Sequence, residues 1–137
     1  MKTSIFRTLA TLSLSAALSP LSLLAQRPIH VTVPFDFTAG SKSLPAGKYS
    51  ARQLTNSGVL AIRSVDGHSA RVIMTHAAQA NAAPGTAKLT FNQYGDRYFL
   101  SQVSGNDLGW ELPKSPAEKE LIAKAPPAKP VTLVAGK

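Results

Sequence analysis

Hydrophobic and polar residues alternate along the first segment after residue 28. Every second position from residue 29 to 37 is apolar, and polar side chains or proline stand between; the apolar residues are Ile29, Val31, Val33, Phe35 and Phe37. A period of two turns one row of side chains towards a core and the other towards water, which predicts a half-buried strand. Pro34 has no N–H to donate to a neighbouring strand, so we predict a sheet edge or a break there.

The turn signal Asp66-Gly67 separates two further strand-like runs. Asp-Gly is the strongest short hairpin signal, because both turn positions need a positive φ that these residues tolerate. A two-residue loop would pair Val59 with Met74. Both faces of this hairpin then carry apolar side chains, which predicts a place in the middle of a sheet, covered at least partly on each side.

A second hairpin is predicted at Gly95-Asp96, where glycine in the first turn position suits a type II′ turn. The flanking runs are residues 88–94 and 97–103. In the register set by this turn, one face is mainly apolar and the other mainly polar, as an antiparallel sheet with one solvated face requires. Phe99 falls on the polar face.

A short helix is predicted from Ser115 to about Lys124. Ser115, Pro116 and Glu118 match a capping box with proline in the first helical position. A helix of this length is not stable alone in water, so we expect it to dock on the sheet, with Trp110 as a candidate contact.

The chain ends in a segment rich in proline and lysine, residues 125–137. Its proline content predicts an extended, disordered tail. Residues 131–135 are nevertheless apolar enough to pair as a strand, either with this domain or with another chain.

Short strands joined by hairpins, with little helix, indicate an all-β fold. We predict a single antiparallel meander of about six strands with a short C-terminal helix, covering residues 26–124. A small sandwich and a partly open barrel both fit this pattern.

The N-terminus has the layout of a secretory signal. Lys2 and Arg7 precede a charge-free stretch rich in leucine, alanine and serine, and Ala25 suits signal peptidase. Pro20 and the serines argue against a membrane-spanning helix, which needs roughly 20 mostly apolar residues. We therefore predict that residues 1–25 are a cleaved signal peptide and that the mature protein is periplasmic or secreted.

Composition narrows the partners and the chemistry. Removal of Lys2 and Arg7 lowers the formal net charge from +8 to +6. Export removes nucleic acid from the list of partners for this basic chain and leaves envelope components: a polysaccharide, a lipid or a protein. Contact with the membrane is expected only transiently, through the signal peptide. The chain has no cysteine, which excludes thiol chemistry and disulfides, so a hydrophobic core must stabilise it.

The residues suggest no catalytic set. His30, His68 and His76 lack the spacing of a local metal site, and no Gly-x-Ser-x-Gly elbow is present. The seven acidic residues supply few candidates for paired carboxylates. We expect no cofactor, no metal and no enzyme; a small hydrolase is the last of the alternatives.

Aromatic residues gather in the last third of the sequence, and Arg97, Phe99 and Trp110 are the candidate ligand-contact surface. An aromatic ring beside polar side chains can stack on a sugar or a peptide. The competing interpretation, which the sequence favours, is that Phe99 is covered by the C-terminal helix or by Trp110.

Four motifs occur in a fixed order: VPFDF at 33–37, LPAGKY at 44–49, YGDRYFLS at 94–101 and ELPKS at 111–115. Together they resemble a family of small exported proteins of uncharacterised function, common in Acidobacteria. The resemblance spans roughly residues 30–122 and implies an envelope or secreted setting in a diderm bacterium. It supplies no activity and no site residues.

These observations predict a non-enzymatic, envelope-associated binding module for a polysaccharide, a lipid or a protein. The alternative is a structural subunit that uses the C-terminal tail as a pairing strand in a neighbour's sheet. The sequence leaves the oligomeric state open.

Overall fold

The computed structural model of the chain describes residues 27–80, 82–83, 85–105, 107–124 and 127–135. The predicted signal peptide, residues 1–25, lies outside these residues. The elements in chain order are β1 (Ile29–Val33), β2 (Phe37–Ala39), β3 (Lys42–Leu44), β4 (Gly47–Thr55), β5 (Val59–Ser64), β6 (Ala70–Met74), β7 (His76–Ala78), β8 (Lys88–Tyr94), β9 (Arg97–Gly105), β10 (Leu108–Glu111), α1 (Pro116–Lys124) and β11 (Lys129–Val134).

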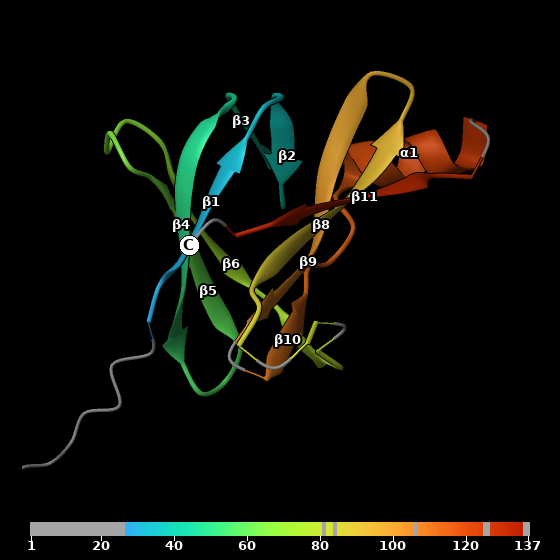
Figure 1. Cartoon of the computed structure of the whole chain (residues 1–137). Coiled ribbons are helices and arrows are strands. Elements are labelled where there is room, and N and C mark those ends of the chain that lie inside the picture. The colour runs from blue at the N-terminus through green and yellow to red at the C-terminus, as the bar shows by residue number, and fades with distance from the viewer. Residues whose placement is uncertain (1–26, 81, 84, 106, 125–126, 136–137) are drawn as a thin grey trace, which may run out of the picture.

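Two sheets make up the domain (Figure 1). The first has four antiparallel strands in the order β1-β4-β5-β6, and the second has the order β11-β8-β9-β10-β7. β2 pairs with β3 and, in parallel, with β9. The sheets are not closed into a barrel. The predicted all-β fold with a short C-terminal helix is confirmed, and the described residues form eleven strands rather than about six, because the predicted runs are broken into shorter strands and the tail adds one.

The core is formed where the inward rows of both sheets meet. Val33 and Tyr49 come from the first sheet and Phe91 from the second, and all three are buried. The Phe37 ring meets the Tyr49 ring edge to face at 5.1 Å and the Phe91 ring at 5.4 Å. Aromatic contacts of this kind add to the burial of apolar area, so Phe37 ties one sheet to the other.

The first predicted strand breaks at Pro34, as expected, and the chain resumes as β2. Asp36 lies in the break and points away from the core. Its Oδ1 accepts a hydrogen bond of 2.8 Å from the Ala46 N–H, and the Tyr49 hydroxyl donates to the Pro45 carbonyl at 2.5 Å. These bonds connect the break to the turn that precedes β4.

The β5–β6 hairpin has the register that Asp66-Gly67 predicts, with Val59 opposite Met74. The expected central position holds for β5, which lies between β4 and β6, but is wrong for the hairpin's second strand. β6 is an edge strand, and its outward side chains, Val72 and Met74, are exposed. Apolar residues on the outer face of this hairpin are therefore not a sign that the face is buried.

The β8–β9 hairpin also has the predicted register near its turn, with Asn92 opposite Phe99. Further along, Thr90 pairs with Gln102 and Phe91 with Leu100, so the ladder is irregular there. Phe91 and Leu100 face the core as expected. The opposite face is not simply solvated, because α1 is bound to it.

Helix α1 begins as predicted and docks through a carboxylate. The Ser115 hydroxyl accepts a hydrogen bond of 3.2 Å from the Glu118 N–H, which is the expected N-cap. The Glu118 side chain, only 3% exposed, accepts hydrogen bonds from Asn92 Nδ2 at 2.9 Å and from the Tyr94 hydroxyl at 3.2 Å. These bonds attach the helix to β8. α1 has nine residues, and no helix formed by the described residues could cross a bilayer.

The tail pairs with its own domain. β11 runs antiparallel to β8, with Val131 opposite Phe91, and Val131 and Leu133 pack against the core. The predicted disorder of residues 125–137 is therefore wrong for β11, since its apolar side chains find a place at the sheet edge. Every described element and the described core lie within residues 27–135. A chain of residues 27–137 therefore retains all the described contacts.

Candidate functional site

Arg97 and Phe99, two residues of the predicted ligand surface, lie together on the face of β9 that α1 covers. The Arg97 guanidinium carbon is 5.3 Å from the centre of the Phe99 ring. Tyr94 meets Phe99 edge to face at 5.8 Å, and its hydroxyl binds Glu118 of the helix. Burial, and then the nearby Glu118 carboxylate, raise the pKa of Tyr94. Phe99 is only 1% exposed, so it offers no stacking face to a ligand.

Trp110, the third predicted residue, lies on the opposite face of the same sheet. It is opposite Val103 of β9, and both residues belong to the core cluster, which does not include Phe99. The single surface predicted from Arg97, Phe99 and Trp110 therefore does not assemble. Its members point to the two sides of one sheet, because the ladder irregularity between the Thr90–Gln102 and Phe91–Leu100 pairs shifts the alternation of β9 between Phe99 and the Val103 position that pairs with Trp110.

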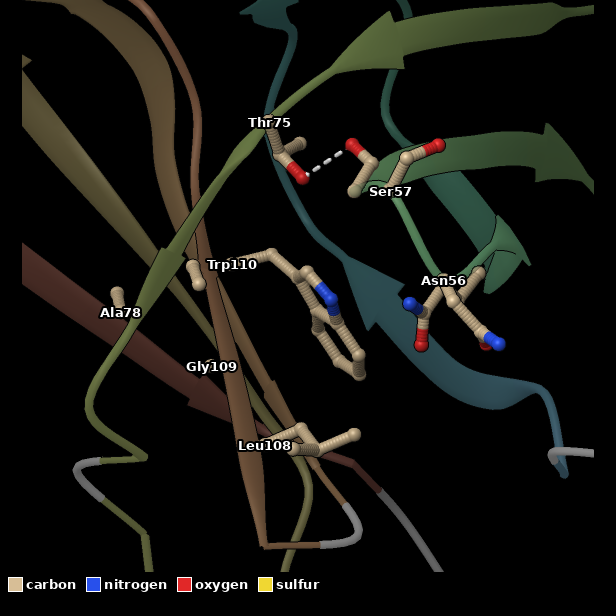
Figure 2. A pocket seen from close by; sticks show the side chains of 10 residues that line it. Asn56, Ser57, Thr75, Ala78, Leu108, Gly109 and Trp110 are labelled. Carbon is tan, nitrogen blue, oxygen red and sulfur yellow. Dashed lines mark hydrogen bonds between the residues drawn. The ribbon is translucent and has the colours of Figure 1, made fainter.

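A pocket of about 410 Å³ opens beside Trp110 (Figure 2). It lies between β10 and β7 of the second sheet and the loop that joins β4 to β5 of the first. Figure 2 shows the Trp110 indole reaching from β10 towards Asn56, with Leu108 on the same strand. The pocket thus has one wall in each sheet. Trp110 belongs mainly to the core, with 7% of its surface exposed, and is the largest side chain that lines the pocket.

Close packing of β10 on β7 holds the Trp110 wall. A Cβ on Gly109 would lie 2.7 Å from the Gln79 carbonyl oxygen and 2.8 Å from that of Ala78. Only glycine fits such an approach without a shift of the backbone. Trp110, next in the chain, pairs with Ala77 of β7, so the strand that carries the indole is fixed on both sides.

The opposite wall of the pocket is hydrogen-bonded to Thr75, the residue between β6 and β7. Gly58 has φ +86°, and a Cβ there would lie 2.7 Å from the Thr75 carbonyl oxygen. The Gly58 carbonyl accepts hydrogen bonds from the Thr75 N–H at 2.7 Å and the Thr75 hydroxyl at 2.6 Å. These two hydrogen bonds hold the neighbouring Asn56 and Ser57 at the pocket.

The pocket is uncharged and carries hydrogen-bonding side chains. None of its lining residues is ionisable. Gln53 donates from Nε2 to the Thr55 carbonyl at 2.8 Å, while its Oε1, closed off from solvent, has no hydrogen-bond partner. A buried acceptor without a partner is rare in native proteins. The site therefore combines an aromatic face, amides, hydroxyls and one unsatisfied acceptor.

A second pocket, of about 380 Å³, lies over the β5–β6 turn. Asp66 in this turn accepts hydrogen bonds from the Ser64 hydroxyl at 2.5 Å and the His68 N–H at 3.0 Å, and these bonds lower its pKa. Burial and the Asp66 and Asp36 carboxylates raise the pKa of Tyr49 beside it. Asp66 is already bonded within the turn and the Tyr49 hydroxyl already donates to Pro45, so this pocket is the weaker candidate.

Metal ligands do not gather in the part of the chain that the structure describes. No group of three or more histidine, aspartate or glutamate side chains is placed to hold an ion there. His68 instead lies 3.5 Å from Asp66 in the turn. The expected absence of a metal, a cofactor and an enzymatic activity stays a prediction.

No protein-family model matches the chain, and neither a curated protein nor a solved structure shows significant similarity to it. The resemblance to the acidobacterial family of exported proteins therefore stays a prediction, carried by the four motifs alone.

Proposed function

We propose that the protein is a non-enzymatic binding module and that the Trp110 pocket takes a neutral saccharide unit of an envelope polysaccharide. The observation that carries this proposal is the Trp110 indole, which is 7% exposed and lines the pocket opposite amide and hydroxyl side chains in a wall without charge. The class of ligand follows from those groups. A sugar ring presents apolar C–H groups on its faces and hydroxyls at its edge, and so complements such a wall.

Size and polarity support a small neutral polar ligand over a lipid chain or an anionic ligand. Binding pockets for small molecules have volumes of about 300–1,000 Å³, and this pocket, at about 410 Å³, lies in the lower part of that range. A lipid chain would leave the Asn56 and Ser57 groups unpaired. An anionic ligand would find no cation in the wall.

Gln53 gives the proposal a specific polar contact. Its Oε1 has no partner, and an unpaired buried acceptor costs about 1–3 kcal/mol. Rotation of the amide towards the pocket would let a sugar hydroxyl donate to this oxygen, while Nε2 would exchange its bond to the Thr55 carbonyl for one to a sugar oxygen. Binding would then satisfy a group that the protein alone leaves unpaired.

Trp110 is the only tryptophan in the chain, so its fluorescence reports on the site directly. We expect neutral oligosaccharides from a glycan array to shift or quench the emission of the 27–137 chain in a saturable way. Trp110→Phe retains an aromatic ring and should weaken binding measured by calorimetry, and Gln53→Leu should do the same.

Thr132→Ala is the matched control, because Thr132 is an exposed residue of β11 on the far edge of the second sheet. It should bind as the parent does. Saturable sugar binding that Trp110→Phe and Gln53→Leu both leave unchanged would place the site elsewhere and refute the proposal. Absence of binding across a broad neutral glycan array would refute it as well.

The proposal includes a periplasmic or secreted location. The N-terminal pattern of two cations followed by a charge-free stretch supports it. Mass spectrometry of the protein from the periplasm or culture medium should find a chain that begins near residue 26, whereas a full-length chain in the cytosol would contradict export. The two alternatives, a subunit joined through its tail strand and a small hydrolase, stay predictions that no described contact favours.

A further inference from the structure

The outer face of the first sheet is lined by side chains that point away from the core. Register and alternation place them in rows across β4, β5 and β6. One row contains Arg52, Ala61 and Val72, and the next contains Arg63 and Ala70. Lys48 and Val65 meet at the end near the turn, where the Val65 N–H donates to the Lys48 carbonyl at 2.8 Å.

Two large apolar side chains of this face, Val72 and Met74, and two beside it, Leu54 at the β4 irregularity and Val65 in the turn, are exposed to solvent. The exposed fractions are 77% for Met74, 61% for Val65, 57% for Val72 and 45% for Leu54. Scattered apolar residues are normal on a surface, but a group on one face marks an interaction site. β6 carries Val72 and Met74 at a sheet edge, so no described strand shields them.

Positive charge is interleaved with these apolar side chains. Lys48, Arg52 and Arg63 are exposed on the same face, and its strands carry no acidic residue. One carboxylate, Asp66, lies in the β5–β6 turn at one end of the face. Within the described residues, it forms an ion pair with His68 and with none of the three cations.

An anionic bilayer surface fits this combination better than a second copy of the chain. In the interfacial region, apolar side chains enter the acyl boundary while lysine and arginine extend to lipid phosphates. Two copies joined through this face would bring cations of one sign together without acidic partners. A purely polar polyanion would leave Met74 and Val72 in water.

We propose that the outer face of the β1-β4-β5-β6 sheet docks on the surface of a membrane that contains anionic lipids. The interaction goes beyond the expected transient contact of the signal peptide. It is also separate from the sugar pocket, which none of the residues of this apolar and cationic face lines. Docking would hold the protein at a membrane while the pocket binds its ligand.

The test is co-flotation of the 27–137 chain with vesicles of phosphatidylcholine alone or with one quarter phosphatidylglycerol. We expect binding to the anionic vesicles only, and weaker binding at higher salt as the charges are screened. Each cation near an anionic surface contributes about fivefold, so Lys48→Gln, Arg52→Gln and Arg63→Gln together should lower the partition coefficient roughly a hundredfold. Val72→Ser with Met74→Ser should lower it by a similar factor.

The matched control removes three cations from other elements, with Lys114→Gln, Lys119→Gln and Lys129→Gln in one chain. It has the same net charge as the first variant and should bind within about twofold of the parent. Thermal unfolding of all variants checks that each is folded. Equal loss in the control would mean that net charge alone acts, and the proposal would fail.

Three other results would overturn the docking proposal. One is equal binding to vesicles without anionic lipid. Another is binding to dextran sulfate with no binding to anionic vesicles. The third is a dimer by analytical ultracentrifugation that the Val72→Ser and Met74→Ser changes dissociate. Sugar binding by the docking-deficient variants should be unaffected, so failure here is distinguishable from failure of the pocket proposal.

Discussion

The two faces of the β8–β9–β10 layer are covered to different extents. On one side, α1 closes over Tyr94 and Phe99 through the buried Glu118 carboxylate. On the other side, Trp110 closes part of the core and also forms a wall of an open pocket. Both sides carry aromatic rings and neighbouring polar groups, but only one leaves space for a ligand. Local composition therefore did not decide which ring is available; the element that covers each face did.

The closed side should lose the most stability on truncation. Phe99→Ala removes a ring that is almost fully buried and should lower the free energy of unfolding by about 3–5 kcal/mol. Urea denaturation followed by circular dichroism measures this. Phe99→Leu, which fills more of the space, should lose less. A silent Phe99→Ala would mean that the helix-covered side is as open as the pocket side.

Loss of the helix anchor should have an intermediate effect. Glu118→Ala leaves Asn92 Nδ2 and the Tyr94 hydroxyl without their acceptor, which we expect to cost about 1–3 kcal/mol in urea denaturation. Glu118→Gln retains an acceptor oxygen and serves as the control with a smaller loss. If alanine and glutamine variants both match the parent, the hydrogen bonds do not hold the helix in place.

The closed side should also respond to alkaline pH. The pKa of Tyr94 is raised in the folded protein above its ordinary value of 10.0 by burial and by Glu118. The folded state thus holds the proton more tightly than the unfolded state, so this contribution to stability is complete below about pH 10 and is lost as the pH rises through the folded pKa. Unfolding midpoints between pH 8 and 11 should fall.

Tyr94→Phe is the variant that isolates this effect. It should reduce the fall of the unfolding midpoint at alkaline pH. Tyr49, whose pKa is also raised, should account for part of the fall that remains. An identical decline in Tyr94→Phe and the parent would assign the alkaline response to other groups and remove this contrast between the two sides.

The open side should show the smallest change in stability. Asn56 lines the pocket and is exposed, so Asn56→Ala should change the free energy of unfolding by less than about 0.5 kcal/mol. Calorimetry with a sugar that the parent binds should show weaker binding. A stability loss as large as that of Glu118→Ala would mean that Asn56 is part of the scaffold rather than a free pocket group.

Local signals predicted the parts of the fold that are built locally. Asp66-Gly67 set the pairing of Val59 with Met74, and Pro34 marked the end of β1. Ser115 capped the helix. In each case a few neighbouring residues determine the backbone, so the sequence contains the whole cause.

Features that depend on distant segments were not predicted. The exposure of Val72 and Met74 depends on which strand is at the sheet edge, and the burial of Glu118 depends on where α1 docks. The pocket joins Trp110 to Gln53 and Asn56, which are far apart in the chain. The Asn56-Ser57-Gly58 segment has the composition of a turn, but nothing within it indicates that it lies opposite an indole.

Thr75 links the two sheets next to the pocket. It is the single residue between β6 of one sheet and β7 of the other, and it is bonded twice to Gly58. A shift of one sheet past the other would strain these two hydrogen bonds, and both Thr75 and Gly58 line the pocket. A sugar that fills the pocket would therefore oppose a relative shift of the two sheets. Amide hydrogen exchange should then slow in both sheets together when the sugar binds.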